Sequence, residues 1–130
     1  MAIKVNGSTV VDDNKLFLPN NSAEVSTTAT ISSNTLTLNL NTATVFNVDL
    51  NANITTLTLS NVQASGRASS FVLVFTGDGN IRSVIWPASF LWPNNTAPTI
   101  TSTLGKKDIF VFFTTDGGTT WQAFVSGQNI

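Results

Sequence analysis

At 130 residues the chain has room for one domain, and 42% of its residues are hydrophobic while only 10% are charged, against about 25% in ordinary globular proteins. Disorder would need the opposite balance, and a net charge of −1 gives no basic surface for nucleic acid or an anionic membrane. The chain has no cysteine and no histidine, which excludes disulfides, thiolate-bound zinc and a histidine-based catalytic triad.

The segment 1–34 is predicted to be an N-terminal arm. Its apolar pieces at 3–5, 9–11 and 16–18 are short and separated by turn residues, so none can build a core. The Thr- and Ser-rich segment 23–31 is interpreted as either an extended arm or an edge strand. We expect the arm to order on the sheet edge of a partner, with these candidate attachment residues: Ile3, Val5, Leu16, Phe17 and Leu18.

From residue 35 the sequence alternates as a half-buried β-strand does. Leucines at 36, 38 and 40 face one way and polar residues the other, and the same alternation recurs at 46–50 and 57–59. Turn residues recur about every ten residues, no helical periodicity lasts more than a turn, and the aromatic loop 88–98 is expected to cover one end of the core. The prediction is an all-β fold: an antiparallel β-sandwich of about eight strands over residues 35–130, jelly-roll in topology.

Two of the predicted strands, 71–75 and 109–113, are apolar at every position. A strand with one wet face would alternate, so both faces of these strands are expected to be covered. Because a domain has one interior, either loops wrap the second face or identical copies of the chain pack it about an axis, and the prediction is packing of copies about a threefold axis. The candidate subunit-interface residues are Phe71, Phe75, Phe110, Phe112 and Phe124.

The segment 114–121, TTDGGTTW, joins the last two apolar strands and fits the Asp-box pattern [S/T]-x-D-x-G-x-T-W, which recurs in sialidases. In that pattern the aspartate accepts backbone N–H groups, the glycines allow a positive φ and the tryptophan packs beneath. A sialidase would need several copies and a tyrosine nucleophile, and this chain has one copy and no tyrosine. The motif is therefore predicted to be a structural hairpin turn, formed by Asp116, Gly117, Gly118, Thr120 and Trp121.

Other chemistry has a weaker basis. The turns at Asp12-Asp13 and 77–80 are the candidates for calcium, but neither has a calcium-loop spacing and turn chemistry explains both. The seven carboxylates show no recognisable glycosidase context. The three tryptophans, at 86, 92 and 121, are interpreted as core residues in preference to a sugar-stacking platform. We expect no enzyme activity, no metal and no cofactor.

A series of short motifs follows in a fixed order: Ala64–Ala68, Phe71–Phe75, Val84–Ala88, Trp92–Pro93, Ala97–Thr99, Gly105–Lys106, Asp108–Phe110, the 116–121 turn and Gly127–Gln128. This series resembles a β-sandwich module of tailed-bacteriophage virion proteins, found in head-decoration (cement) and tail-fibre proteins. The opening MAIKVNGSTV is similar to the start of many phage structural proteins. The resemblance implies a virion protein, and the related modules look trimeric.

Two functions follow from the resemblance. The first is a capsid decoration protein that stabilises the head as a homotrimer and contacts the major capsid protein. The second is a tail-fibre or receptor-binding module that contacts tail proteins and recognises a host glycan. The short leading segment favours decoration, because the stretch 1–34 suffices for an arm but not for a fibre shaft. No secretory signal or membrane span is evident, so synthesis in the host cytoplasm and location in the virion are expected.

Overall fold

The structure of the chain, a computed structural model, describes residues 3–5, 8–11 and 23–130, and it confirms that the fold is all-β. The one helical element of the described residues is a short 3-10 turn, Pro93–Asn95. The strands are β1 (Ile3–Val5), β2 (Ser8–Val11), β3 (Ser26–Thr28), β4 (Thr35–Asn39), β5 (Val45–Leu50), β6 (Thr56–Ser60), β7 (Ser69–Gly77), β8 (Phe90–Leu91), β9 (Lys107–Thr114) and β10 (Trp121–Gly127).

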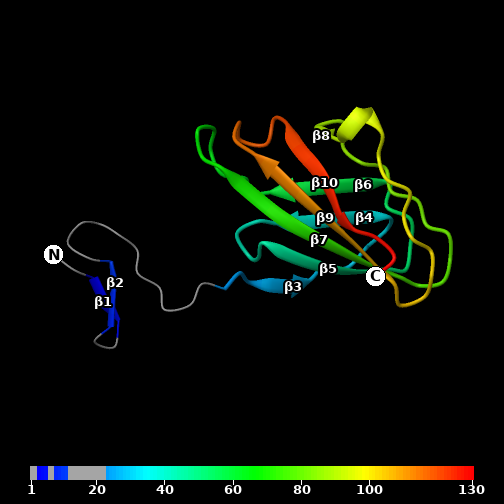
Figure 1. Cartoon of the computed structure of the whole chain (residues 1–130), viewed down its shortest axis with the longest axis horizontal. Coiled ribbons are helices and arrows are strands. Elements are labelled where there is room, and N and C mark those ends of the chain that lie inside the picture. Colours follow the sequence, from blue (N-terminus) through cyan, green and yellow to red (C-terminus); the bar gives the residue numbers. More distant parts are fainter. Residues whose placement is uncertain (1–2, 6–7, 12–22) are drawn as a thin grey trace.

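The strands form three sheets of mixed orientation (Figure 1). Strands β1 and β2 make an antiparallel hairpin, β4 and β6 make a parallel pair, and the remaining strands form a six-stranded sheet in the order β3-β5-β7-β9-β10-β8. Within the large sheet β7, β9 and β10 are antiparallel, whereas β3, β5 and β7 run parallel to one another and β8 runs parallel to β10. The prediction of a purely antiparallel fold is therefore wrong, and with it the jelly roll, whose neighbouring strands are antiparallel.

The parallel pairs arise from the path of the chain between β3 and β7. Successive strands alternate between the large sheet and the β4–β6 pair. Each time the chain re-enters a sheet, the new strand therefore runs in the same direction as the previous strand in that sheet. Parallel neighbours usually need a helical crossover. Here the strand of the opposite sheet serves as the crossover, and two windings are completed without a helix.

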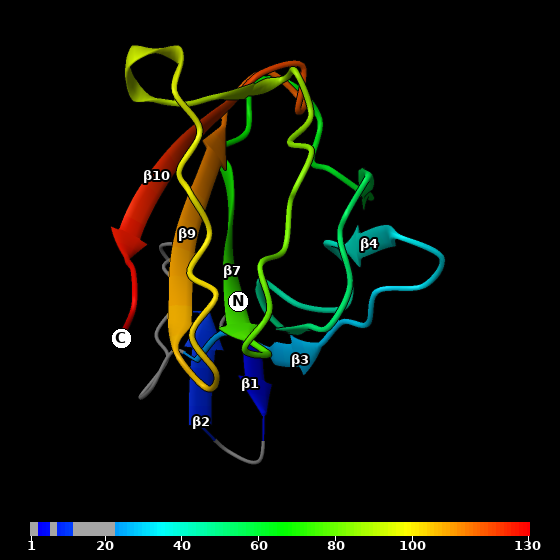
Figure 2. The same ribbon diagram turned by 90° about the vertical axis from the view of Figure 1, so that its right-hand side faces the viewer.

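The two sheets enclose one core. Figure 2 shows β4 on one side and β7, β9 and β10 on the other. The leucines predicted to face inward on β4 are fully buried, and they belong to the same apolar cluster as the aromatic side chains of the large sheet. That cluster contains a stacked pair, Phe71 and Phe112, whose ring centroids lie 4.7 Å apart. The predicted covering loop contributes Phe90 and Trp92 to the core, while Leu91 stays exposed.

The domain begins earlier than predicted. Strand β3, within the segment interpreted as arm or edge strand, pairs in parallel with β5, with Ser26 beside Val45 and Thr28 beside Asn47. The edge-strand interpretation is therefore correct, and the predicted boundary between residues 34 and 35 needs a correction, because β3 belongs to the large sheet. The sequence did not reveal that this strand belongs to the large sheet, because its serine and threonines lack the apolar alternation of the later strands.

The predicted subunit interface was assigned to the wrong face of the large sheet. Four of the five predicted residues, Phe71, Phe75, Phe110 and Phe112, are at most 1% exposed and fill the domain's own core, so they cannot contact another subunit. These four rings occupy the interior, and the smaller β-branched residues between them on β7 and β9 face outward, as does Phe113. Of the five, only Phe124 is available at the surface, at 49% exposure.

This assignment of faces predicts unequal effects of two phenylalanine truncations. Phe112→Ala should lower the free energy of unfolding by about 3–5 kcal/mol, because it empties a fully buried ring site. Phe124→Ala should lower it by about 1 kcal/mol or less, because the ring is half exposed. Urea unfolding followed by tryptophan fluorescence measures both. Equal losses would contradict the assignment.

Candidate functional site

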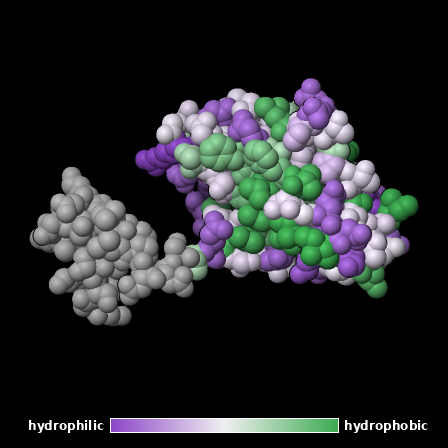
Figure 3. Space-filling model, in the orientation of Figure 1, coloured by the Kyte–Doolittle hydropathy of each residue, from purple (hydrophilic) through white to green (hydrophobic). Residues whose placement is uncertain are grey.

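The outer face of the six-stranded sheet carries a continuous apolar surface. Strand register brings Val72 beside Val111 and Val74 beside Ile109, and Val111 in turn lies beside Phe124. Figure 3 shows hydrophobic side chains gathered across this face. We call it the outer apolar face, and its residues are Val45, Val72, Val74, Ile109, Val111, Phe113 and Phe124.

Polar residues surround the outer apolar face, and few of them are charged. Ser70 and Gln122 flank Phe113 across the sheet at one end, while Asp49 and Lys107 flank Thr76 at the other. These two are the only charged outward-facing residues on β5, β7, β9 and β10. A surface with an apolar centre, a polar rim and little charge is typical of a protein–protein contact. It offers no convergent polar groups for chemistry.

The hairpin turn between β9 and β10 is organised by the carboxylate of Asp116. It accepts hydrogen bonds from the Thr120 backbone N–H (3.0 Å to Oδ1) and hydroxyl (2.7 Å), and from the Thr114 hydroxyl (2.8 Å). These donors stabilise the ionised carboxylate and lower the pKa of Asp116 to about 2. Trp121 follows directly and is buried. The carboxylate makes these hydrogen bonds within its own turn, so the motif is structural.

The two glycines of this turn both have a positive φ, and Gly118 also lies against its neighbours. A Cβ atom at Gly118, where φ is +81°, would come within 2.9 Å of a Val62 methyl group and 3.2 Å of the Trp121 indole nitrogen. Glycine is thus required both for the backbone conformation and for the close packing of the turn.

Asp108 is a buried carboxylate that sequence reasoning missed. It is 1% exposed and accepts hydrogen bonds from the backbone N–H of Thr101 (2.7 Å) and Asn129 (3.1 Å), and from the Gln128 side chain (3.4 Å). It therefore ties the segment before β9 and the residues after β10 to the edge of the core. The sequence signal for this role was a charged residue directly before an apolar run. The same pattern is typical of a solvent-exposed residue at the end of a strand, so it did not indicate a buried carboxylate.

The other candidates for chemistry have structural partners. Arg82 contacts Asp78 at 2.6 Å, and this arginine holds the pKa of Asp78 well below its usual value. Asp78 also accepts the Asn80 backbone N–H at 3.0 Å, as expected of a turn. Over residues 3–5, 8–11 and 23–130 there is no cluster of three or more potential metal-binding side chains. The Asp12-Asp13 turn lies outside the described residues, so the absence of metal stays a prediction.

The tryptophans lie in or against the core. Trp92 and Trp121 are buried, and Trp86 is half-buried with its ring 5.0 Å from Trp92 and 5.4 Å from Phe110. The interpretation as core is correct, and these rings form no exposed platform for a sugar. Of the candidate attachment residues, Ile3 and Val5 fall in β1, whose backbone alone is described. Leu16, Phe17 and Leu18 lie outside the described residues.

Comparison with known proteins adds no assignment. No protein-family model, curated protein or solved structure matches this chain. None of the described residues belongs to a helix long and apolar enough to cross a membrane.

The turn predicts a specific dependence of stability on pH. Because the pKa of Asp116 is lowered from 3.8 to about 2, its contribution should be present above pH about 4 and lost as pH falls through 2. Asp116→Asn should lower the melting temperature at pH 6 and reduce the loss between pH 4 and pH 2. The matched control is Asp49→Asn, an exposed position on β5, which should change the melting curves little. Calorimetry at several pH values measures these curves, and indistinguishable curves for Asp116→Asn and the unchanged chain would contradict the role of this carboxylate.

Proposed function

We propose that this chain is a structural protein of a bacteriophage virion: a capsid decoration protein that acts as a homotrimer through its outer apolar face. The phage resemblance of the sequence motifs provides the context. The observation that carries the proposal is the outer apolar face itself, with Phe113 and Phe124 at 39% and 49% exposure on neighbouring strands. A face of this kind gains free energy when it is buried against another protein.

A structural role also fits the chemistry of the chain. Histidine and cysteine are absent from the whole sequence, and the carboxylates of Asp78, Asp108 and Asp116 are each engaged in turns or backbone ties. We therefore propose that the protein is not an enzyme. We also propose a two-layer β-sandwich as its architecture, since both sheets contribute to one apolar core.

Binding to the capsid is proposed to use the N-terminal residues. The β1–β2 hairpin is short, and a two-stranded hairpin alone is marginally stable in water. Packing on a partner would stabilise it. With 10% charged residues in the chain, the attachment should depend on backbone pairing and apolar burial more than on ion pairs.

The first test is oligomeric state. Light scattering of the purified protein at micromolar concentration should give a mass about three times that of the 13.8 kDa chain. Phe124→Lys should shift the mass toward a monomer, because the ammonium group would be buried between copies. Thr58→Lys, an exposed position on β6, is the matched control and should stay trimeric. A monomeric unchanged protein would contradict the proposal.

The second test is attachment. The full chain and a chain lacking residues 1–22 are mixed with capsids that lack this protein, and then sedimented at low and high salt. The truncation keeps β3, so the domain should stay folded. We expect the full chain to sediment with capsids at both salt concentrations and the truncated chain to stay in solution. If neither binds capsids and the full chain binds host cells, the tail-fibre function replaces decoration.

A further inference from the structure

A groove runs between two neighbouring segments of the domain. Two hollows, of about 500 Å³ and about 310 Å³, lie mainly between the segment 23–32, which contains β3, and the segment 35–44, which contains β4. Thr42 lines both hollows, so they follow one another along the same two segments. Their volumes are typical of ligand sites in proteins.

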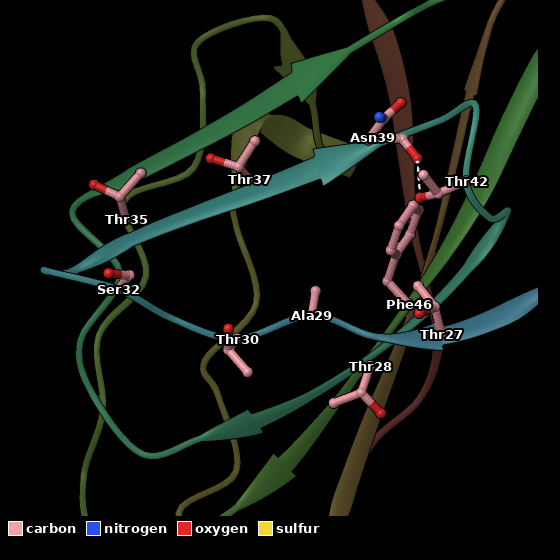
Figure 4. A pocket seen from close by; sticks show the side chains of 10 residues that line it. All are labelled: Thr27, Thr28, Ala29, Thr30, Ser32, Thr35, Thr37, Asn39, Thr42 and Phe46. Atoms are coloured by element: carbon pink, nitrogen blue, oxygen red, sulfur yellow. Dashed lines mark hydrogen bonds between the residues drawn. The ribbon is translucent and has the colours of Figure 1, made fainter.

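Hydroxyl groups dominate the lining of the larger hollow. Figure 4 shows this hollow bounded by the segment 27–32 and by β4, with the side chain of Phe46 at one end. Six threonines and one serine are among its ten lining residues, together with the amide of Asn39. Of the described residues that line it, none is charged. The larger hollow therefore offers many neutral donors and acceptors.

The smaller hollow adds apolar contacts and one carboxylate. Val25, which is 62% exposed, and Leu40 form apolar walls, while Glu24 and Asn41 contribute polar side chains. Glu24 is the one charged residue among the described residues that line either hollow. The smaller hollow thus presents apolar surface directly beside polar groups.

A third hollow, of about 270 Å³, continues the groove beyond Glu24. It shares Glu24, Leu40 and Thr44 with the second hollow, and it adds the amide side chains of Asn61 and Gln63. The Thr44 hydroxyl is buried and has no hydrogen-bond partner among the described residues. Because buried hydroxyl groups in proteins are nearly always hydrogen-bonded, this group favours a polar ligand in the groove.

The lining of the groove selects one class of ligand. No basic side chain of the described residues lines any of the three hollows, so phosphates and carboxylates find no counter-charge there. A lipid or an apolar peptide would leave the hydroxyl and amide groups without partners. Hydroxyl and amide groups both donate and accept, and a carboxylate accepts, so together they match a molecule with many hydroxyl groups.

We propose that this groove binds a neutral oligosaccharide. Glu24, where the second and third hollows meet, accepts hydrogen bonds from two neighbouring hydroxyl groups of one sugar unit. Val25 and Leu40 contact the C–H groups of the sugar ring, and the hydroxyl-lined hollow holds the next units of the chain. The inference goes beyond the proposed function and does not depend on it, since no residue of the outer apolar face lines the three hollows.

Titration of the full chain with three sugar probes tests the site. The probes are short oligomers of glucose, of mannose and of galactose, and amide chemical shifts of the isotope-labelled protein are the readout. We expect at least one probe to cause saturable shifts with a Kd of about 1 mM or lower. The shifted amides should cluster in the segments 23–32, 35–44 and 61–70, which line the groove.

Two variants of equal charge change test the role of the carboxylate. Glu24→Gln keeps the shape of the side chain and should weaken binding of the active probe by about tenfold, because a charged acceptor is lost. Asp49→Asn is the matched control: it also removes one negative charge, but it lies on β5 and lines none of the three hollows. Its Kd should equal that of the unchanged chain.

Three results would overturn the proposal. The first is the absence of saturable shifts with all three probes, and the second is a set of shifts outside the groove. The third is an equal Kd for Glu24→Gln and the unchanged chain. The amide spectrum of each variant without sugar shows that the domain is folded, so a loss of binding is separable from a loss of structure.

Discussion

The contact between the leucine rows of β4 and β6 and the aromatic inner face of β7, β9 and β10 holds the domain together. Neither layer could persist alone, because the two-stranded sheet has no other apolar support and the rings of the large sheet would face water. The winding between β3 and β7 follows from this contact, since every pass of the chain must bring its apolar side back to the same interior. Asp108 and the Asp116 turn then fix the segments that border this interior.

The sequence contains the strands but not their directions. The alternation at 36–40, 46–50 and 57–59 correctly predicted half-buried strands, because side-chain period depends only on local backbone geometry. A parallel and an antiparallel neighbour impose the same period, so the pattern could not reveal that β4 and β6 are parallel. In 71–75 and 109–113 both faces are apolar, so the pattern could not show which face is the core. Four rings are buried (Phe71, Phe75, Phe110 and Phe112), whereas the outward face carries valines and an isoleucine together with Phe113.

The sequence correctly predicted that the large sheet has a second apolar face, but it assigned the wrong residues to that face. An apolar second face on the large sheet was expected, and the structure has one, but its members are mostly valine and isoleucine in place of the phenylalanines. The Asp116 turn was recognisable because all its interactions are local in sequence. The role of Asp108 was not, because its partners Thr101 and Asn129 belong to irregular segments that only the folded chain brings together.

The order of pairing in the large sheet restricts when this domain can fold during synthesis. Strand β7 is central and ends at Gly77, whereas its antiparallel neighbour β9 begins only at Lys107. As the chain leaves the ribosome, the two parallel windings emerge first, while the edge of β7 that pairs with β9 stays open. The β9–β10 hairpin, which is the most local antiparallel pair of that sheet, emerges last and closes the structure. Folding therefore waits for the hairpin, and a chaperone that shields β7 in the interval would raise the yield of folded protein.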